Sequence, residues 1–226
     1  MHAYDIPNNL PLIEETRICE PCTQSKLHSK RTRKKREGNK SSEPLQLIFI
    51  DLIGPFPQSI HYKNTRALTL KDDYSGFVMF GFLPDKEAST VVEKLLHMLD
   101  VIYIISGVKV NTIQADYGSE FTATVFRKTL TSLGYMIRYT PTDTAAFNGQ
   151  IERMHRYIVS LASAARLAAS LPESFWEECM RQAVSVYNAI GTKSNPCPLK
   201  RLTEKQPTYT HFRTIGSKVL YRIPSD

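Results

Sequence analysis

The chain has 226 residues, 42% hydrophobic and 23% charged, which is enough for one sizeable globular domain and a small extra segment. No apolar run reaches the roughly 18–20 residues that a membrane helix needs, and the first residues lack the basic-then-apolar order of a signal peptide. We therefore expect a soluble, intracellular protein that does not cross a membrane.

The first 25 residues form a short, proline-containing segment with a Cys-x-x-Cys motif, Cys19 and Cys22. This spacing lets two thiolates bind one metal ion, and a tetrahedral zinc site needs two further ligands. The available histidines are His2 and His28, which give only half of a recognisable site. Zinc binding, a pair of free thiols and redox use therefore all remain open.

Residues 26–43 form a basic, serine-containing linker. Within it, residues 26–40 hold eight Lys or Arg and one Glu, so this stretch accounts for the whole net charge of +7. Such an arm suits nucleic-acid phosphates or a nuclear-import receptor, and a solvated linker is the plain alternative. The candidate nucleic-acid-binding residues in it are Lys30, Arg31, Arg33, Lys34, Lys35 and Arg36.

From residue 45 onward the hydrophobic pattern predicts a three-layer α/β fold. Strands are predicted at 45–52, 66–71 and 77–83 as an antiparallel meander, with a turn at 72–76. The elements that follow are helices at 87–106, 121–133, 149–169 and 173–190, strands at 108–116 and 135–139, and a Pro-rich tail from 192 with short β segments. Ser89 or Thr90 is expected to cap the first helix. This order predicts a sheet covered by helices.

The remaining two cysteines do not suggest a disulfide framework. Cys179 is expected to pack in its helix beside Trp176, and Cys197 lies between two prolines. Isolated thiols of this kind fit a reducing compartment.

Two of the predicted strands end in an aspartate. A lone buried carboxylate is very unfavourable unless it is paired or binds a cation, so Asp51 needs a hydrogen-bond donor or a metal. Asp116 ends the strand at 108–116, and ligands of α/β sheets often bind at the carboxyl ends of strands. We hypothesise that the two acids lie side by side. Taken singly, a hydrogen-bonded turn explains either residue equally well.

A third acid, Glu152, lies in the first turn of the helix at 149–169. The helix dipole and a pair with Arg156 would explain it alone. However, 35 residues separate it from Asp116, which completes an Asp, Asp-35-Glu arrangement with Asp51.

Several short motifs accompany these acids in order. They are Phe-Ile-Asp-Leu-Ile-Gly-Pro at 49–55, Asp-Asp-Tyr-Ser-Gly at 72–76, Asp-Tyr-Gly-Ser-Glu-Phe at 116–121, Tyr-Thr-Pro at 139–141, Asn-Gly-Gln-Ile-Glu-Arg at 148–153, Leu-Pro-Glu-Ser-Phe-Trp at 171–176, Tyr-Asn at 187–188 and Ile-Gly at 215–216. On these residues the chain, over 17–224, resembles the integrases of copia-class LTR retrotransposons of the yeast type, within the retroviral integrase superfamily.

The resemblance implies an RNase H-like fold with a mixed five-stranded sheet, and two Mg²⁺ or Mn²⁺ ions. Asp51 would bridge both ions, with Asp116 on one and Glu152 on the other. A 3′-hydroxyl of element cDNA would then attack a phosphodiester of host DNA. Without metal, each acid is expected to have a raised pKa.

The resemblance also implies that the polar side of the helix at 149–169 faces DNA. The expected phosphate contacts are Gln150, Arg153, His155 and Arg156. Glu120 and Asn148 are expected to surround the ligands, and Asp72 and Asp73 to serve a turn. Tyr117 and Phe147 are expected to pack in the core rather than to stack on bases.

The resemblance divides the chain into four segments. They are a truncated zinc-binding-like segment at 1–25, the basic linker at 26–43, the integrase catalytic core at 44–192 and its C-terminal extension at 193–226. Family members carry a histidine pair ahead of the two cysteines; the pair is absent here, so the zinc site is expected to be incomplete.

The implied partners are DNA, namely element cDNA ends and host target DNA, and further copies of the chain. The protein is also expected to be part of a Gag-Pol polyprotein and to act in the nucleus, and in the cytoplasm within a virus-like particle. Two other functions stay open: a catalytically inactive nucleic-acid-binding remnant of a decayed transposon, favoured by the truncated zinc segment, and another RNase H-like nuclease. The three acids favour chemistry, and their spacing disfavours the nuclease.

Overall fold

The structure is a computed structural model that describes residues 20–21, 40–140, 145–191 and 196–217, with only the backbone for 145–150. Several predictions fall outside the described residues. They concern Cys19 and Cys22 with their zinc ion, the basic residues Lys30, Arg31, Arg33, Lys34, Lys35 and Arg36, and the side chains of Phe147, Asn148 and Gln150.

Five strands form one mixed sheet in the order β3-β2-β1-β4-β5. β1 (Leu47–Ile53), β2 (Arg66–Asp72) and β3 (Val78–Leu83) form the predicted antiparallel meander. β4 (Thr112–Ala115) runs parallel to β1, and β5 (Met136–Tyr139) runs parallel to β4. The mixed five-stranded sheet is therefore confirmed, with β1 at its centre.

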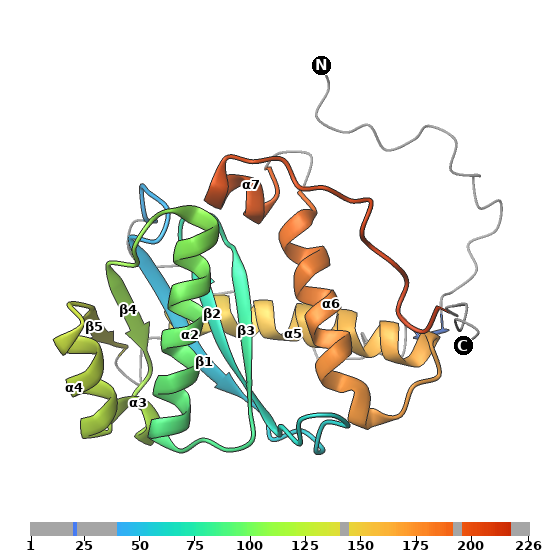
Figure 1. Cartoon of the computed structure of the whole chain (residues 1–226), viewed down its shortest axis with the longest axis horizontal. Helices are drawn as coiled ribbons and strands as arrows, with labels where there is room; N and C mark the ends of the chain where they lie inside the picture. Colours follow the sequence, from blue (N-terminus) through green and yellow to red (C-terminus); the bar gives the residue numbers. More distant parts are fainter. Residues whose placement is uncertain (1–19, 22–39, 141–144, 192–195, 218–226) are drawn as a thin grey trace, which may run out of the picture.

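Helices cover both faces of this sheet (Figure 1). α2 (Ala88–Ser106) packs on one face, whereas α5 (Ala145–Ala168) and α6 (Trp176–Ala189) pack on the other. The shorter helices are α3 (Ser119–Thr122), α4 (Thr124–Ser132), η1 (Glu173–Phe175) and α7 (Pro198–Thr203). This is the predicted three-layer α/β architecture.

The side chains of β1 alternate between two hydrophobic cores. Ile48 and Ile50 belong to the core under α2, and Phe49 belongs to the core under α5 and α6. Because both faces are covered, the strand reads as a continuous apolar run. Since successive side chains point to opposite faces, Asp51 lies on the same face as Phe49, toward α5.

The turn between β2 and β3 depends on two aspartates, as predicted. The buried Asp72 carboxylate accepts hydrogen bonds from the N–H of Leu45 at 2.9 Å and from the N–H and hydroxyl of Ser75 at 2.8 and 2.6 Å. Asp73 accepts hydrogen bonds from the N–H and hydroxyl of Ser41 at 2.7 and 2.8 Å. These contacts also tie the start of the core to this turn.

Two predictions about helix ends were wrong. The N-cap of α2 is Glu87, which makes no side-chain cap bond, so neither Ser89 nor Thr90 caps the helix. The single helix predicted at 121–133 is two helices, α3 and α4. They are separated by Ala123, whose extended backbone (φ −56°, ψ 144°) cannot continue a helix.

Two predictions about strands were also wrong. β4 begins at Thr112 rather than at 108, because its partner β1 begins at Leu47, opposite Thr112. Among residues 196–217 the tail contains the helix α7 and no β segment. Pro198 suits the first turn of α7, and the Cys197 Sγ accepts a hydrogen bond from the Lys200 N–H at 3.4 Å.

α6 is joined to the edge strand β3 by a buried amide. The Asn188 Oδ1 accepts a hydrogen bond from the Val78 N–H at 3.0 Å, and its Nδ2 donates to the Val78 carbonyl at 2.6 Å. Cys179 is fully buried in the same helix, in one core cluster with Trp176, as predicted.

We expect Asn188→Ala to lower the free energy of unfolding by about 2 kcal/mol or more, since it leaves both polar backbone groups of the buried Val78 without partners. Urea unfolding measures this. Ser185→Ala is the matched control, because the Ser185 hydroxyl is on the exposed side of α6 and bonds only within the helix. A loss no greater than that of Ser185→Ala would contradict the role assigned to Asn188.

Candidate active site

The parallel register of β1 and β4 brings two acids to the same end of the sheet. Leu47 pairs with Thr112 and Phe49 pairs with Gln114, each pair 65 positions apart. The same offset, continued along the two strands, places Asp116 beside Asp51. The structure therefore brings these two acids together, on the face that α5 covers.

The Asp51 carboxyl lies in a strongly negative environment. Burial is the largest cause that raises its pKa from 3.8 to about 7, followed by the charges of Asp116, Glu120 and Glu152. The N–H of Leu52 donates to Asp51 Oδ1 at 2.8 Å and opposes this rise. Glu152 is thus close enough to act on Asp51. Because α5 begins at Ala145, Glu152 is the eighth residue of the helix, and the prediction that it lies in the first turn was wrong.

Exposure differs among the acids. The Asp51 side chain is 34% exposed, Asp116 is half-buried and Glu152 is exposed. Asp116 accepts a hydrogen bond from the Gly118 N–H at 2.9 Å, which is the Asx-type turn that the sequence also allowed. The turn explains how Asp116 is oriented and does not exclude its use as a ligand.

Glu120 contributes more to the site than its sequence position suggested. Its charge raises the Asp51 pKa more than that of Glu152 does. A Cβ on Gly118 would lie 3.0 Å from Asp116 Oδ1 and 3.1 Å from Glu120 Oε1, so a larger residue here would require at least one of the two carboxylates to shift. The Asp-x-x-x-Glu spacing at the start of α3 is the signal that could have identified Glu120.

The donor chemistry of this site suits a hard divalent cation. The side chains are all carboxylates, and their mutual repulsion at Asp51 is what a bound cation would relieve. Among the described residues, however, no three His, Cys, Asp or Glu lie close enough together to hold a metal ion. The site offers carboxylate oxygens and negative charge, without a closed ligand cage.

His155 does not lie on the polar side of α5 that was expected to face DNA, so this expectation was wrong. It is only 8% exposed, and it follows Ile151 by four positions on the stripe that faces the sheet. Its Nε2 lies 2.7 Å from the Thr69 hydroxyl, and its Nδ1 lies 3.8 Å from Asp51 Oδ2. Burial, and then the charge of Lys71, lowers its pKa to about 4, so it is neutral at pH 7.

Two other residues predicted on this helix lie at solvent-facing positions, as expected. Arg153 and Arg156 are exposed, on the side of α5 away from the sheet. Their contact with DNA stays a prediction.

Tyr117 was expected to pack in the core, and this was wrong. It is 57% exposed and stacks on Tyr139, with ring centroids 5.3 Å apart and planes inclined by 25°.

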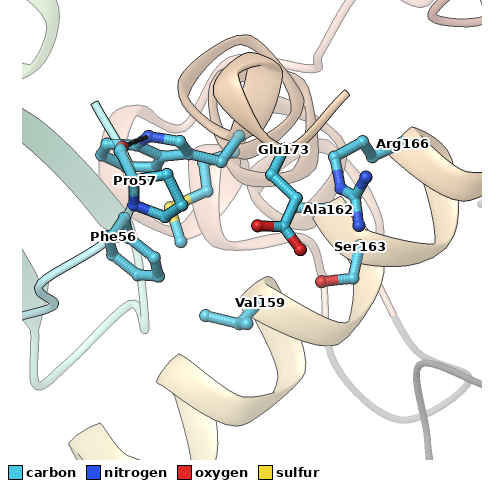
Figure 2. A pocket seen from close by; sticks show the side chains of 9 residues that line it. Phe56, Pro57, Val159, Ala162, Ser163, Arg166 and Glu173 are labelled. Carbon is cyan, nitrogen blue, oxygen red and sulfur yellow. Dashed lines mark hydrogen bonds between the residues drawn. The ribbon is translucent and has the colours of Figure 1, made fainter. Parts of the chain in front are cut away.

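A cavity of about 200 Å³ lies further along α5, and the acids do not line it (Figure 2). Arg166 and Ser163 of α5 face Glu173 of η1 across it. Its other lining residues are Phe56, Pro57, Val159, Ala162, Trp176 and Met180. We assign the chemistry to the sheet end rather than to this cavity, because the convergent carboxylates are at the sheet end.

Within the part of the chain that the structure describes, no helix is both long enough and apolar enough to cross a bilayer.

No protein-family model matches the sequence. The chain is 27% identical, over 210 residues, to the retrovirus-related Pol polyprotein from transposon TNT 1-94 of Nicotiana tabacum, covering 92% of this chain and 16% of that protein. It is 27% identical, over 179 residues, to the retrovirus-related Pol polyprotein from transposon RE2 of Arabidopsis thaliana, covering 78% and 12%. The chain therefore spans at most about a sixth of the length of these relatives.

Three solved structures share the fold. They are the HTLV-2 integrase catalytic core domain in complex with magnesium (TM-score 0.57, 17% identity, 72% of this chain and 99% of that one), the BIV integrase catalytic core domain (0.54, 19%, 70% and 93%) and a chain of the simian T-cell lymphotropic virus intasome (0.62, 14%, 87% and 66%). The fold is thus the RNase H-like fold of integrase catalytic cores. Together with the Pol homologues, it confirms the resemblance to copia-class integrases.

We expect Asp51 to titrate near pH 7 in the folded chain. Its pKa in the unfolded chain is near 3.8, so the folded state holds the proton more tightly, and this contribution to stability is lost as the pH rises from about 4 to about 7. Asp51→Asn should remove that loss. Urea unfolding at intervals across this range measures it.

His155 acts in the opposite direction and provides the control. Its pKa falls from 6.5 to about 4 on folding, so its contribution is present above about pH 6.5 and is lost as the pH falls toward 4. The stability of Asp51→Asn should therefore rise between about pH 4 and 6.5. The same pH dependence in Asp51→Asn and the unmodified chain would contradict the raised pKa of Asp51.

Proposed function

We propose that this chain is the catalytic region of a retrotransposon integrase, which joins 3′-hydroxyl ends of element cDNA to host DNA by metal-dependent strand transfer. One observation carries the proposal: the parallel register of β1 and β4 brings Asp51 and Asp116 to one end of the sheet, where the charges of Asp116 and Glu152 both raise the pKa of Asp51. The homology to Pol polyproteins and the shared fold with integrase cores support this class of reaction.

In this proposal Asp51, Asp116 and Glu152 hold the Mg²⁺ or Mn²⁺ ions. When bound, such ions activate an attacking hydroxyl and stabilise the leaving oxygen of a phosphodiester. The protein's own contribution is to orient the carboxylates. The N–H of Leu52 donates a hydrogen bond to one oxygen of Asp51, and the N–H of Gly118 donates to one oxygen of Asp116.

His155 supports Asp51 without neutralising it. Because the imidazole is neutral at pH 7, it does not compensate the charge of the carboxylate 3.8 Å away. Its contact with the Thr69 hydroxyl, on the strand next to Asp51, holds the ring against the sheet. The imidazole therefore leaves the Asp51 carboxylate available for a cation whenever this group, with its pKa of about 7, is deprotonated.

DNA binding would use the cationic surfaces of the chain. Arg153 and Arg156 face solvent on the helix that carries Glu152, and the basic linker supplies further positive charge. The partners proposed are element cDNA ends, host DNA and further copies of the chain, within a Gag-Pol product. Such a protein would act in the nucleus after its time in a cytoplasmic particle, and Cys19 and Cys22 would supply half of a zinc site.

A joining assay tests the proposal. The chain is incubated with a pre-processed donor duplex, plasmid and Mg²⁺ or Mn²⁺, and joined products are counted. We expect Glu152→Gln to lower joining by about a hundredfold or more, because it removes one charged metal ligand. The matched control is Glu173→Gln, an acid that faces the cavity further along α5, and it should join normally.

Other outcomes identify the alternative functions. DNA binding without joining by the unmodified chain would indicate a non-catalytic remnant. Nicking without joining would indicate a nuclease. Equal joining by Glu152→Gln and the unmodified chain would exclude the proposed role of Glu152.

The salt dependence of DNA binding tests the cationic surfaces. We expect deletion of residues 26–40 to flatten the slope of log K against log salt, because fewer counterions are released from the phosphates. Replacing both Arg153 and Arg156 by Gln should reduce the slope by about 2, one for each phosphate contact. Fluorescence anisotropy at several salt concentrations measures both, and an unchanged slope would refute the corresponding contacts.

A further inference from the structure

A pair of stacked tyrosines lies beside the proposed catalytic acids. Tyr117 directly follows Asp116, and its ring lies nearly parallel to that of Tyr139, with centroids 5.3 Å apart. Tyr117 is 57% exposed, so an aromatic surface remains open to solvent next to a carboxylate that we propose as a metal ligand. Neither the homology nor the three acids assigns a role to this pair.

Tyr139 gives the pair a rigid base. It pairs with Ala115 in the ladder between β4 and β5, and its hydroxyl donates to the Phe121 carbonyl at 2.7 Å. Phe121 is itself buried in the core, at 1% exposure. Tyr139 is therefore held by a strand and by a helix together, and Tyr117 stacks on a ring that cannot easily move away.

A second pair of tyrosines in the described residues is not stacked in this way. Tyr157 is as exposed as Tyr117 and lies near Tyr187, but those two rings are inclined by 59°. They do not offer a common face.

A cation completes the surroundings of the stacked pair. Burial raises the pKa of Tyr139, and the charge of Arg127 opposes this rise, so the guanidinium of α4 lies within electrostatic reach of the ring. Arg127 is exposed. An exposed tyrosine, stacked on a second tyrosine that lies near a cation, can bind a nucleobase and its phosphate.

We propose that Tyr117 and Tyr139 form a stacking platform for the terminal nucleobase of the DNA end that reacts at the acids. This rests on the proposed function. The faces of bases inside a duplex are covered by their neighbours, and only an end or an unpaired nucleotide offers a free face. Donor cDNA has ends, whereas target DNA is continuous, so the platform selects the donor end. Stacking tolerates any base, so the platform positions the end without reading its sequence.

A double-mutant cycle without metal tests this. The full chain is titrated with a duplex that ends in one unpaired nucleotide and with the same duplex in which that nucleotide is abasic. For the unmodified chain, the abasic end should weaken binding about tenfold, since stacking of one base on an aromatic ring has about this effect. Tyr117→Ala should bind the two duplexes equally.

Three further variants make the cycle specific. Tyr117→Phe keeps the ring and should behave as the unmodified chain does. Tyr117→Leu keeps apolar surface without a π face and should behave as Tyr117→Ala does. Tyr103→Ala is the matched control, because Tyr103 is 55% exposed, about as much as Tyr117. Tyr103 lies near the C-terminal end of α2, which leads into the start of β4, whereas Tyr117 follows the end of β4.

The outcomes separate this inference from the proposed function. An equal abasic penalty in Tyr117→Ala and the unmodified chain, or no penalty in the unmodified chain, would overturn the platform even if DNA joining occurs. Loss of the penalty in Tyr117→Ala and Tyr117→Leu would support it even if the chain does not join DNA. Thermal unfolding of each variant verifies that the comparison is between folded proteins.

Discussion

The hydrogen-bonded register between the parallel strands β1 and β4 decides where the carboxylates of this chain meet. Leu47 opposite Thr112 fixes every later pair, so Asp51 and Asp116 reach the same end of the sheet on the same face. A shift of one residue would turn one of the two acids to the opposite face. The meander on one side of β1 and the β4–β5 pair on the other hold this register from both directions.

In the folded chain no positively charged side chain among the described residues pairs with Asp51 to offset the repulsion from the neighbouring acids. The groups that contact Asp51 are the N–H of Leu52 and a histidine that carries no charge at pH 7. Elsewhere the chain does pair its buried acids: Asp72 accepts three hydrogen bonds, and the fully buried Glu177 accepts from Asn64 and Arg181. This difference between structural and candidate catalytic carboxylates is typical of sites that bind an external cation.

The sequence predicted the features that depend on local pattern. An acid near the end of an apolar run identified Asp51 and Asp116, and turn chemistry identified Asp72 and Asp73. His155 was misplaced although its spacing from Ile151 put it on the buried stripe, because its polarity was given more weight than its position. The contact of Tyr117 with Tyr139 could not be predicted, since it depends on the pairing of β4 with β5.

Under the proposed function, the hydrogen bonds of Asp72 and Asp73 have a consequence for the length of DNA that the chain would cover. They fasten residues 41 and 45, where the basic linker joins the core, to the turn at the end of the sheet opposite the acids. Five residues lie between Leu45 and Asp51, and the six residue steps span about 20 Å of extended chain. Phosphates held at the root of the linker would thus lie about six nucleotide steps from the bond being joined. The protein would then hold its DNA at a position well away from the phosphodiester bond that reacts.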